Sequence, residues 1–453
     1  MSKSPFAIRG VIEGFYGPPW SHAQRLDMID FLARHKMNTF LHAPKDDPFI
    51  RENWRDPYTG EQLEVLKELI DRSAQNSIMF VPCLSPGLSM EYSSTSDRSA
   101  LIEKFLSTAR LGVSAVGLLL DDIPLRLQHP DDQAVYDSLV SAQIAAINAV
   151  YEALPTGMKL FVCPTQYYGR GDEDYITELG RGIDPRIEVF WTGREICSPA
   201  LDLYDAAVIT RTLNRPVTFW DNYPVNDVAM THELHVGPYQ NRDRDLARFS
   251  RGVIANPMEY FESSKIALAT IADYLNDPQA YEPEASWSVA IEQIAGPAAE
   301  DYRIFADNSR SSCLSPTDAP ELTAAFDDFF FARDYGDPQI AAEELSAFAD
   351  DLLGAAQRLK AAAAAGNPLL VEAAAWLETF DLGARTIKVI SELSAAPTIE
   401  ELENLKTLHA QIQNTGKRMF GDVLHMTLMD LTMPVRATPN LAVRMDRTTK
   451  EEE

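Results

Sequence analysis

Two adjacent aspartates, Asp121 and Asp122, directly follow the apolar run of residues 113–120. Where a buried strand ends, desolvation and mutual repulsion raise the pKa of at least one of two neighbouring acids. One acid can then stay protonated near neutral pH while the other stays charged. Acetal cleavage needs this division, because one group donates a proton and the other stabilises positive charge. Asp-Asp is also common in surface turns, so the surrounding residues must decide between the two interpretations.

Short apolar or β-branched runs recur through the first 255 residues, and helix-like segments separate them. Eight strand–helix units are the content of a (β/α)8 barrel of roughly 250 residues. A doubly wound open sheet is the alternative, but no Gly-x-Gly-x-x-Gly follows an early strand. We therefore expect an α/β fold, a (β/α)8 TIM-type barrel followed by a C-terminal all-α helical bundle. The expected strands are 7–12, 37–42, 78–83, 113–120, 158–163, 187–191, 217–220 and 252–255.

The sequence pattern changes after the eighth unit. Residues 276–284 contain two prolines and several acids, which is typical of a linker. Beyond them Leu345 and Leu352 follow helical spacing, and Thr398 with Glu401 matches a capping box. We expect a catalytic barrel domain over 1–275, a linker over 276–284, a helical bundle domain over 285–435 and a disordered tail over 436–453.

The composition, with 45% hydrophobic and 24% charged residues, is that of a soluble globular protein. A formal net charge of −27 argues against nucleic acid or an anionic membrane as a partner. The N-terminus lacks the apolar stretch of a secretory signal, and no run is long enough to span a membrane. The four cysteines are scattered, with no Cys-x-x-Cys pair. These features predict a cytoplasmic protein.

Chemistry in such a barrel collects where strands end and the following loops begin. Nearly every expected strand end in this chain has an aromatic ring together with a carboxylate, amide or ammonium group. Aromatic rings can stack on the apolar faces of a sugar, while Asp, Asn and Lys bond its hydroxyls. A phosphate site would instead call for Gly-rich loops and arginines. The pattern therefore indicates a carbohydrate site.

The strings at these strand ends resemble glycoside hydrolase family 84, the β-N-acetylglucosaminidases that include protein O-GlcNAcase and its bacterial relatives. The resemblance covers residues 6–275, in the family's order and spacing. It implies substrate-assisted retention, in which the sugar's own 2-acetamido oxygen attacks the anomeric carbon and forms an oxazoline. The matching strings are Arg9-Gly-Val-Ile-Glu-Gly-Phe-Tyr-Gly-Pro-Pro-Trp20, Met37-Asn-Thr-Phe40, Ala43-Pro-Lys-Asp-Asp47, Leu120-Asp-Asp-Ile123, Cys163-Pro-Thr-Gln-Tyr167, Trp191-Thr-Gly193, Trp220-Asp-Asn222 and Ala255-Asn-Pro257.

The resemblance implies three catalytic residues. Asp121 matches the residue that orients the acetamido N–H, and Asp122 matches the general acid that later acts as base. Tyr167 matches the hydroxyl that holds the acetamido carbonyl oxygen, a role that the neighbouring Tyr168 could imitate. Because neighbours on a regular strand point to opposite faces, both aspartates can reach one ligand only where the strand loses regularity.

Further positions match residues that bind the sugar. Lys45, Asp227 and Asn256 would bond its hydroxyls, with the backbone of Gly14 close to the same ring. For Lys45 the alternative is a solvated salt bridge. Asn222 would bond the N-acetyl group or the adjacent aspartate.

The remaining matches concern the walls of the pocket. Trp220 would form one wall, although a tryptophan at a strand end is more often plain core. Cys163 and Thr192 would line the acetyl pocket, where small side chains leave room for a methyl group. A buried thiol beneath the site is an equal alternative for Cys163.

The sequence thus predicts a retaining exo-β-N-acetylglucosaminidase that acts on terminal β-linked GlcNAc, with serine or threonine of proteins among the candidate carriers. It predicts no cofactor and no metal. Two alternatives stay open: an endo-acting hexosaminidase on a polymer such as hyaluronan, and a non-catalytic glycan-binding scaffold. The helical domain could form a homodimer interface or a platform for substrate proteins.

Overall fold

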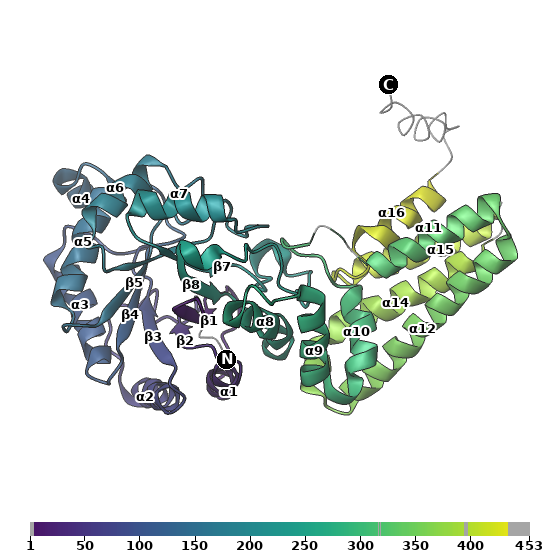
Figure 1. Cartoon of the computed structure of the whole chain (residues 1–453), viewed down its shortest axis with the longest axis horizontal. Helices are drawn as coiled ribbons and strands as arrows, with labels where there is room; N and C mark the ends of the chain where they lie inside the picture. The colour runs from purple at the N-terminus through teal and green to yellow at the C-terminus, as the bar shows by residue number, and fades with distance from the viewer. Residues whose placement is uncertain (1–3, 316, 318, 394–396, 434–453) are drawn as a thin grey trace, which may run out of the picture.

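The computed structural model describes residues 4–315, 317, 319–393 and 397–433. Its N-terminal part is a closed barrel of eight parallel strands in sequence order, which confirms the expected fold class. Figure 1 shows this barrel beside an elongated group of C-terminal helices. The strands are β1 (Ile8–Glu13), β2 (Thr39–His42), β3 (Met79–Leu84), β4 (Ala115–Leu119), β5 (Lys159–Cys163), β6 (Glu188–Trp191), β7 (Val217–Asp221) and β8 (Ser250–Ala255).

Several barrel helices begin at a side chain that caps their first N–H groups. In α5 (Leu139–Ala153), for example, Ser138 and Ser141 form a capping box, and Val140 and Ile147 are buried. Short 3-10 turns, η1 (Val228–Met230) and η2 (Leu246–Arg248), lie between β7 and β8. The helices are α1 (His22–Arg34), α2 (Gly60–Gln75), α3 (Thr95–Ala109), α4 (Pro130–Val135), α5 (Leu139–Ala153), α6 (Asp174–Gly182), α7 (Leu203–Leu213) and α8 (Phe261–Asn276).

Side chains fill the inside of the barrel below its carboxyl end. Phe161 and Phe190 stack with ring centroids 5.5 Å apart, and Phe190 meets Trp220 edge-on at 5.8 Å. Ile12 and Ile254 are fully buried in the same cluster. The interior is thus a packed core rather than a pore. It forms a solid floor beneath the loops that follow the strands.

The C-terminal part is all helical, as expected. Leu345 and Leu352 are buried, and Thr398 forms the predicted capping box with Glu401. The Glu372 carboxylate joins this part to the barrel by accepting hydrogen bonds from the first N–H groups of α8. The expected tail at 436–453 lies outside the described residues. The helices are α9 (Pro283–Ala295), η3 (Gly296–Ala298), α10 (Ala299–Asp307), α11 (Pro320–Tyr335), α12 (Pro338–Ala364), α13 (Pro368–Glu372), α14 (Ala374–Ser391), α15 (Ile399–Asn414) and α16 (Gly421–Thr432).

Candidate active site

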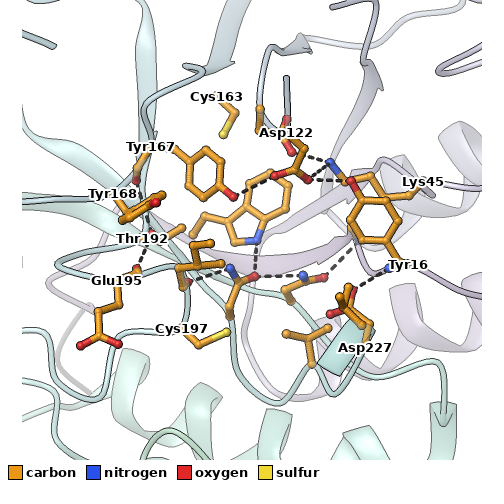
Figure 2. Close-up of a pocket in the computed structure, with 18 of the residues that line it drawn as sticks. Tyr16, Lys45, Asp122, Cys163, Tyr167, Tyr168, Thr192, Glu195, Cys197 and Asp227 are labelled. Atoms are coloured by element: carbon orange, nitrogen blue, oxygen red, sulfur yellow. Dashed lines mark hydrogen bonds and ion pairs between the residues drawn. The ribbon is translucent and has the colours of Figure 1, made fainter. Parts of the chain in front are cut away.

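A cavity of about 870 Å³ opens at the carboxyl end of the barrel, within the size range of small-molecule sites. Every site residue predicted from the sequence lines this cavity. Figure 2 shows a close-up of the pocket with Lys45, Asp122 and Tyr167 among the labelled side chains. The predicted residues come from the ends of β1, β2 and β4 to β8, which a closed parallel barrel brings to one rim. These residues are Gly14, Lys45, Asp121, Asp122, Cys163, Tyr167, Thr192, Trp220, Asn222, Asp227 and Asn256.

The backbone after β4 explains how two neighbouring acids share the cavity. The strand ends at Leu119, and the next residue, Leu120, still donates its N–H to the carbonyl of Cys163 at 2.8 Å. Asp122 then adopts a left-handed conformation with φ of 56°. That conformation costs a residue other than glycine about 1–2 kcal/mol. It ends the alternation of the strand, so Asp121 and Asp122 both line the cavity.

Lys45 supplies the positive charge beside the two acids. Its ammonium group donates to Asp121 Oδ2 and lies 3.6 Å from Asp122 Oδ2. Burial lowers the pKa of Lys45, but the two carboxylates raise it by more, so this pKa lies above its ordinary value. The solvated salt bridge considered for Lys45 is therefore wrong, because its side chain is only 3% exposed.

Asp121 keeps one oxygen available. Its Oδ1 is buried and has no hydrogen-bond partner within the described part of the chain. Buried polar atoms are normally paired, so such an atom at a cavity wall is a candidate acceptor for a ligand N–H or O–H.

Asp122 accepts hydrogen bonds from two tyrosines. Tyr16 donates to Oδ2 at 2.7 Å and Tyr167 donates to Oδ1 at 2.8 Å. Burial raises the pKa of Asp122, but Lys45 and the two phenols outweigh burial, and the pKa lies below its ordinary value. The expectation that repulsion leaves one acid protonated is therefore wrong for Asp122 in this pocket. The cation contributed by β2 reverses the direction of the shift.

Tyr167, and not its neighbour, points its hydroxyl at the acids. Burial and the negative charge of Asp122 raise the pKa of Tyr167, which keeps the phenol neutral and able to donate. Tyr168 packs edge-on against it with ring centroids 5.5 Å apart and is 41% exposed at the rim (Figure 2).

The opposite wall is a network of amides. Asn222 Oδ1 accepts from Trp220 Nε1 at 2.9 Å and from Asn256 Nδ2 at 3.0 Å. Asn222 donates in turn to the carbonyl of Ile196 and not to an aspartate, which was one of its two expected partners. A Cβ on Gly14 would lie 2.7 Å from the Trp220 ring, so glycine allows this close approach.

Asp227 and Asn256 both hold the loop after β1. Asp227 Oδ2 accepts the backbone N–H of Tyr16 at 2.7 Å, and Asn256 Oδ1 accepts that of Gly14 at 3.2 Å. Burial raises the pKa of Asp227 although the Tyr16 N–H opposes it. The loop carrying Tyr16 is therefore tied to the ends of β7 and β8.

Cys163 and Thr192 contribute small surfaces to the cavity. Cys163 is the last residue of β5 and is 2% exposed, and burial raises the pKa of its thiol. The geometry therefore fits both interpretations of this residue, a buried thiol and a cavity wall. Thr192 donates its hydroxyl to the carbonyl of Glu195 at 2.7 Å.

The structure adds residues that the sequence did not nominate. Tyr16 lies inside a matched string, three residues after β1, so its position was a detectable signal. The others lie in loops whose course no periodicity reveals. They are Tyr168, Glu195, Ile196, Cys197, Val225, Val228, Ala229 and Met230.

No three or more His, Cys, Asp or Glu side chains in the described part of the chain are grouped so that they could hold a metal ion. No helix within it has both the length and the apolar character that a membrane crossing needs.

Comparison with known proteins agrees with this geometry. A family model described as beta-N-acetylglucosaminidase matches residues 9–307. The chain belongs to this family, glycoside hydrolase family 84. The matched residues run from β1 to α10 and include the strand ends that surround the cavity.

Curated and solved relatives extend the comparison. Protein O-GlcNAcase of Rattus norvegicus and that of Mus musculus are each 33% identical over 271 residues, which is 58% of this chain but only 29% of theirs. A solved mutant of Thermobaculum terrenum O-GlcNAc hydrolase is 33% identical with a TM-score of 0.89, covering 99% of this chain and 98% of its own. The solved structure of CpGH84B is 28% identical with a TM-score of 0.85, covering 95% of this chain and 78% of its own.

Proposed function

We propose that the protein is a retaining exo-β-N-acetylglucosaminidase, a glycoside hydrolase that removes terminal β-linked GlcNAc by substrate-assisted catalysis. One observation carries the proposal: Asp121, Asp122 and the Tyr167 phenol line a single cavity in a chain of family 84.

The acetamido group of the substrate acts as the nucleophile. Asp121 accepts its N–H through the unpaired Oδ1, which increases electron density on the carbonyl oxygen. Tyr167 donates to that oxygen and holds it beneath the anomeric carbon. Cys163 and Thr192 leave space for the methyl group.

Two displacements at the anomeric carbon complete the reaction. In the first, the carbonyl oxygen forms a bond to this carbon, the bond to the leaving oxygen breaks, and Asp122 gives that oxygen a proton. In the second, Asp122 takes a proton from water, the water oxygen bonds to the anomeric carbon, and the protonated oxazoline, whose N–H stays hydrogen-bonded to Asp121, opens to acetamide. Two inversions give net retention.

The low pKa of Asp122 in the empty pocket fits this scheme because Tyr167 has one proton to donate. Without substrate the Tyr167 hydroxyl donates its hydrogen bond to Asp122 Oδ1. When that hydroxyl donates to the acetamido carbonyl instead, Asp122 loses one of the contacts that lower its pKa. Substrate binding then raises the pKa of Asp122 and prepares it as the acid.

Three residues around the sugar support an exo action. Lys45, Asp227 and Asn256 bond its hydroxyls, and the packed barrel interior lies beneath them. Such a floor prevents a glycan from continuing through the bottom of the cavity, which fits a terminal residue bound there. The relatives, protein O-GlcNAcase and O-GlcNAc hydrolase, favour serine- and threonine-linked GlcNAc as the substrate.

The test is hydrolysis of 4-methylumbelliferyl β-GlcNAc by the purified full chain, with the released anomer followed by NMR. We expect monosaccharide of β configuration to appear first, and loss of activity in Asp121→Ala. Release of oligosaccharides from a GlcNAc-containing polymer without free GlcNAc would support an endo enzyme instead. Binding without any turnover would support a glycan-binding scaffold.

We further propose that the protein is cytoplasmic and forms a homodimer. Four free cysteines fit the reducing cytoplasm. For a homodimer through the helical part we look to α11, where Phe331 is 67% and Tyr335 is 71% exposed. Sedimentation of the wild-type chain and of Phe331→Glu tests this, since only the wild type should dimerise.

A further inference from the structure

A cluster of buried polar side chains lies behind the active site without lining the cavity. Gln143 on α5 is fully buried, Tyr92 and Thr165 are nearly so, and Tyr175 on α6 is half-buried. Tyr92 lies in the loop before α3, and Thr165 follows β5 by two residues. Four separate segments thus meet at one point behind the carboxyl ends of β4 and β5.

The hydrogen bonds of this cluster converge on one backbone carbonyl. Gln143 Nε2 donates to Thr165 Oγ1 at 2.8 Å and to the Tyr92 hydroxyl at 3.1 Å. Because Thr165 Oγ1 accepts from Gln143, its own proton is available, and it goes to the carbonyl of Leu120 at 2.7 Å. Tyr175 donates to Gln143 Oε1 and accepts the backbone N–H of Thr165.

Leu120 is the residue immediately before the two catalytic aspartates. Its N–H donates to the Cys163 carbonyl at the end of β5, and its own carbonyl accepts from Thr165, two residues further on. Both polar groups of Leu120 are therefore fixed to the end of the neighbouring strand and the residues that follow it. Two residues later Asp122 occupies the left-handed region, a conformation that persists only when its surroundings enforce it. The Leu120 anchor is one such enforcing contact.

We propose that Thr165 and Gln143 are positioning residues for the reaction: through the Leu120 carbonyl they hold the turn that presents Asp121 and Asp122 to the substrate. This inference rests on the proposed function. Neither residue touches the cavity, so each acts on the rate without acting on the binding of the sugar. A misplacement of about 1 Å at a reacting group can lower a rate about a hundredfold.

The test compares Thr165→Val with a matched control, Thr218→Val. Both remove a buried hydroxyl with the same change of shape, but the Thr218 hydroxyl in β7 has no hydrogen-bond partner within the described residues. We expect Thr165→Val to lower kcat on a GlcNAc-peptide about ten- to a hundredfold with KM changed less than about threefold. Thr218→Val should keep kcat, and Thr165→Ser, which keeps the hydroxyl, should restore most of it.

Further measurements separate positioning from loss of structure. Gln143→Leu combined with Thr165→Val should lower kcat no more than the stronger single variant, because both act through one carbonyl. Equal kcat in Thr165→Val and Thr218→Val would overturn this inference but not the proposed function. A loss of kcat that a smaller folded fraction in thermal unfolding fully explains would do the same. An inactive but folded wild-type chain would overturn the proposed function and this inference together.

Discussion

Replacing Asp122 by Asn tests the division of roles between the two aspartates. Asn has nearly the same shape, and its Oδ1 can still accept from one of the two tyrosines that contact Asp122. The charge of the group formed by Lys45, Asp121 and Asp122 changes from −1 to neutral, so the buried lysine keeps a partner. We therefore expect the variant to fold with little change in its melting temperature.

The rate effect should depend on the leaving group. General acid catalysis contributes about 10²- to 10⁴-fold, which corresponds to about 2.7–5.4 kcal/mol in the activation free energy. A serine alkoxide needs the proton, so kcat/KM on a GlcNAc-peptide should fall by that factor. Nitrophenolate leaves without protonation, so kcat/KM on 4-nitrophenyl GlcNAc should fall less than about tenfold.

The assay measures both substrates on one enzyme preparation, by absorbance for nitrophenol and by chromatography for the peptide. Asp121→Asn is the control, because the orientation of the acetamido group precedes the departure of either leaving group. That variant should lower both rates by similar factors. An equal fall of kcat/KM on both substrates in Asp122→Asn would refute the assignment of Asp122 as the proton donor.

Three further predictions follow from contacts in and beside the cavity. Tyr16→Phe removes a hydrogen-bond donor that favours the charged form of Asp122, so the pKa of Asp122 should rise. The alkaline limb of the pH profile of kcat/KM should then move to higher pH, and an unmoved limb would contradict this. Tyr167→Phe should lower kcat about a hundredfold, measured at saturating substrate, and an unchanged kcat would remove its role. Arg242→Met leaves the buried Asp221 carboxylate uncompensated, and urea unfolding should show a loss of about 3–5 kcal/mol, with a loss below about 1 kcal/mol counting against the argument.

The strands could be predicted from the sequence because barrel strands are buried on both faces and appear as apolar runs. The expected run at 113–120 contains β4, and the run at 158–163 differs from β5 by one residue. The start of β8 was missed because Ser250 and Arg251 are polar. Ser250 is nevertheless buried and bonds the carbonyl of Val217, a tertiary contact that apolarity alone does not indicate.

The site could be predicted because parallel strands place all their carboxyl ends on one rim, so order along the chain is enough to gather the residues. Tyr168, Ile196 and Val228 were not predicted as cavity residues, because they line the cavity from the connections that follow the strands. Loop course depends on contacts such as the Asn222 amide bonding the Ile196 carbonyl, which joins residues 26 positions apart. Sequence spacing carries no information about such contacts.

The protonation state of the acids shows most clearly where inference from sequence ends. Asp121 and Asp122 next to each other imply repulsion and a raised pKa, yet the pKa of Asp122 is lowered. The reversal comes from Lys45, whose ammonium group reaches the pair from 76 residues away along the chain, and from two phenols on other loops. An acid that rests ionised must take up a proton from solvent when substrate arrives. The Tyr167 hydroxyl can donate its one hydrogen bond either to Asp122 or to the acetamido carbonyl. Transfer of that hydrogen bond to the sugar therefore raises the pKa of Asp122 and couples binding of the sugar to readiness of the acid.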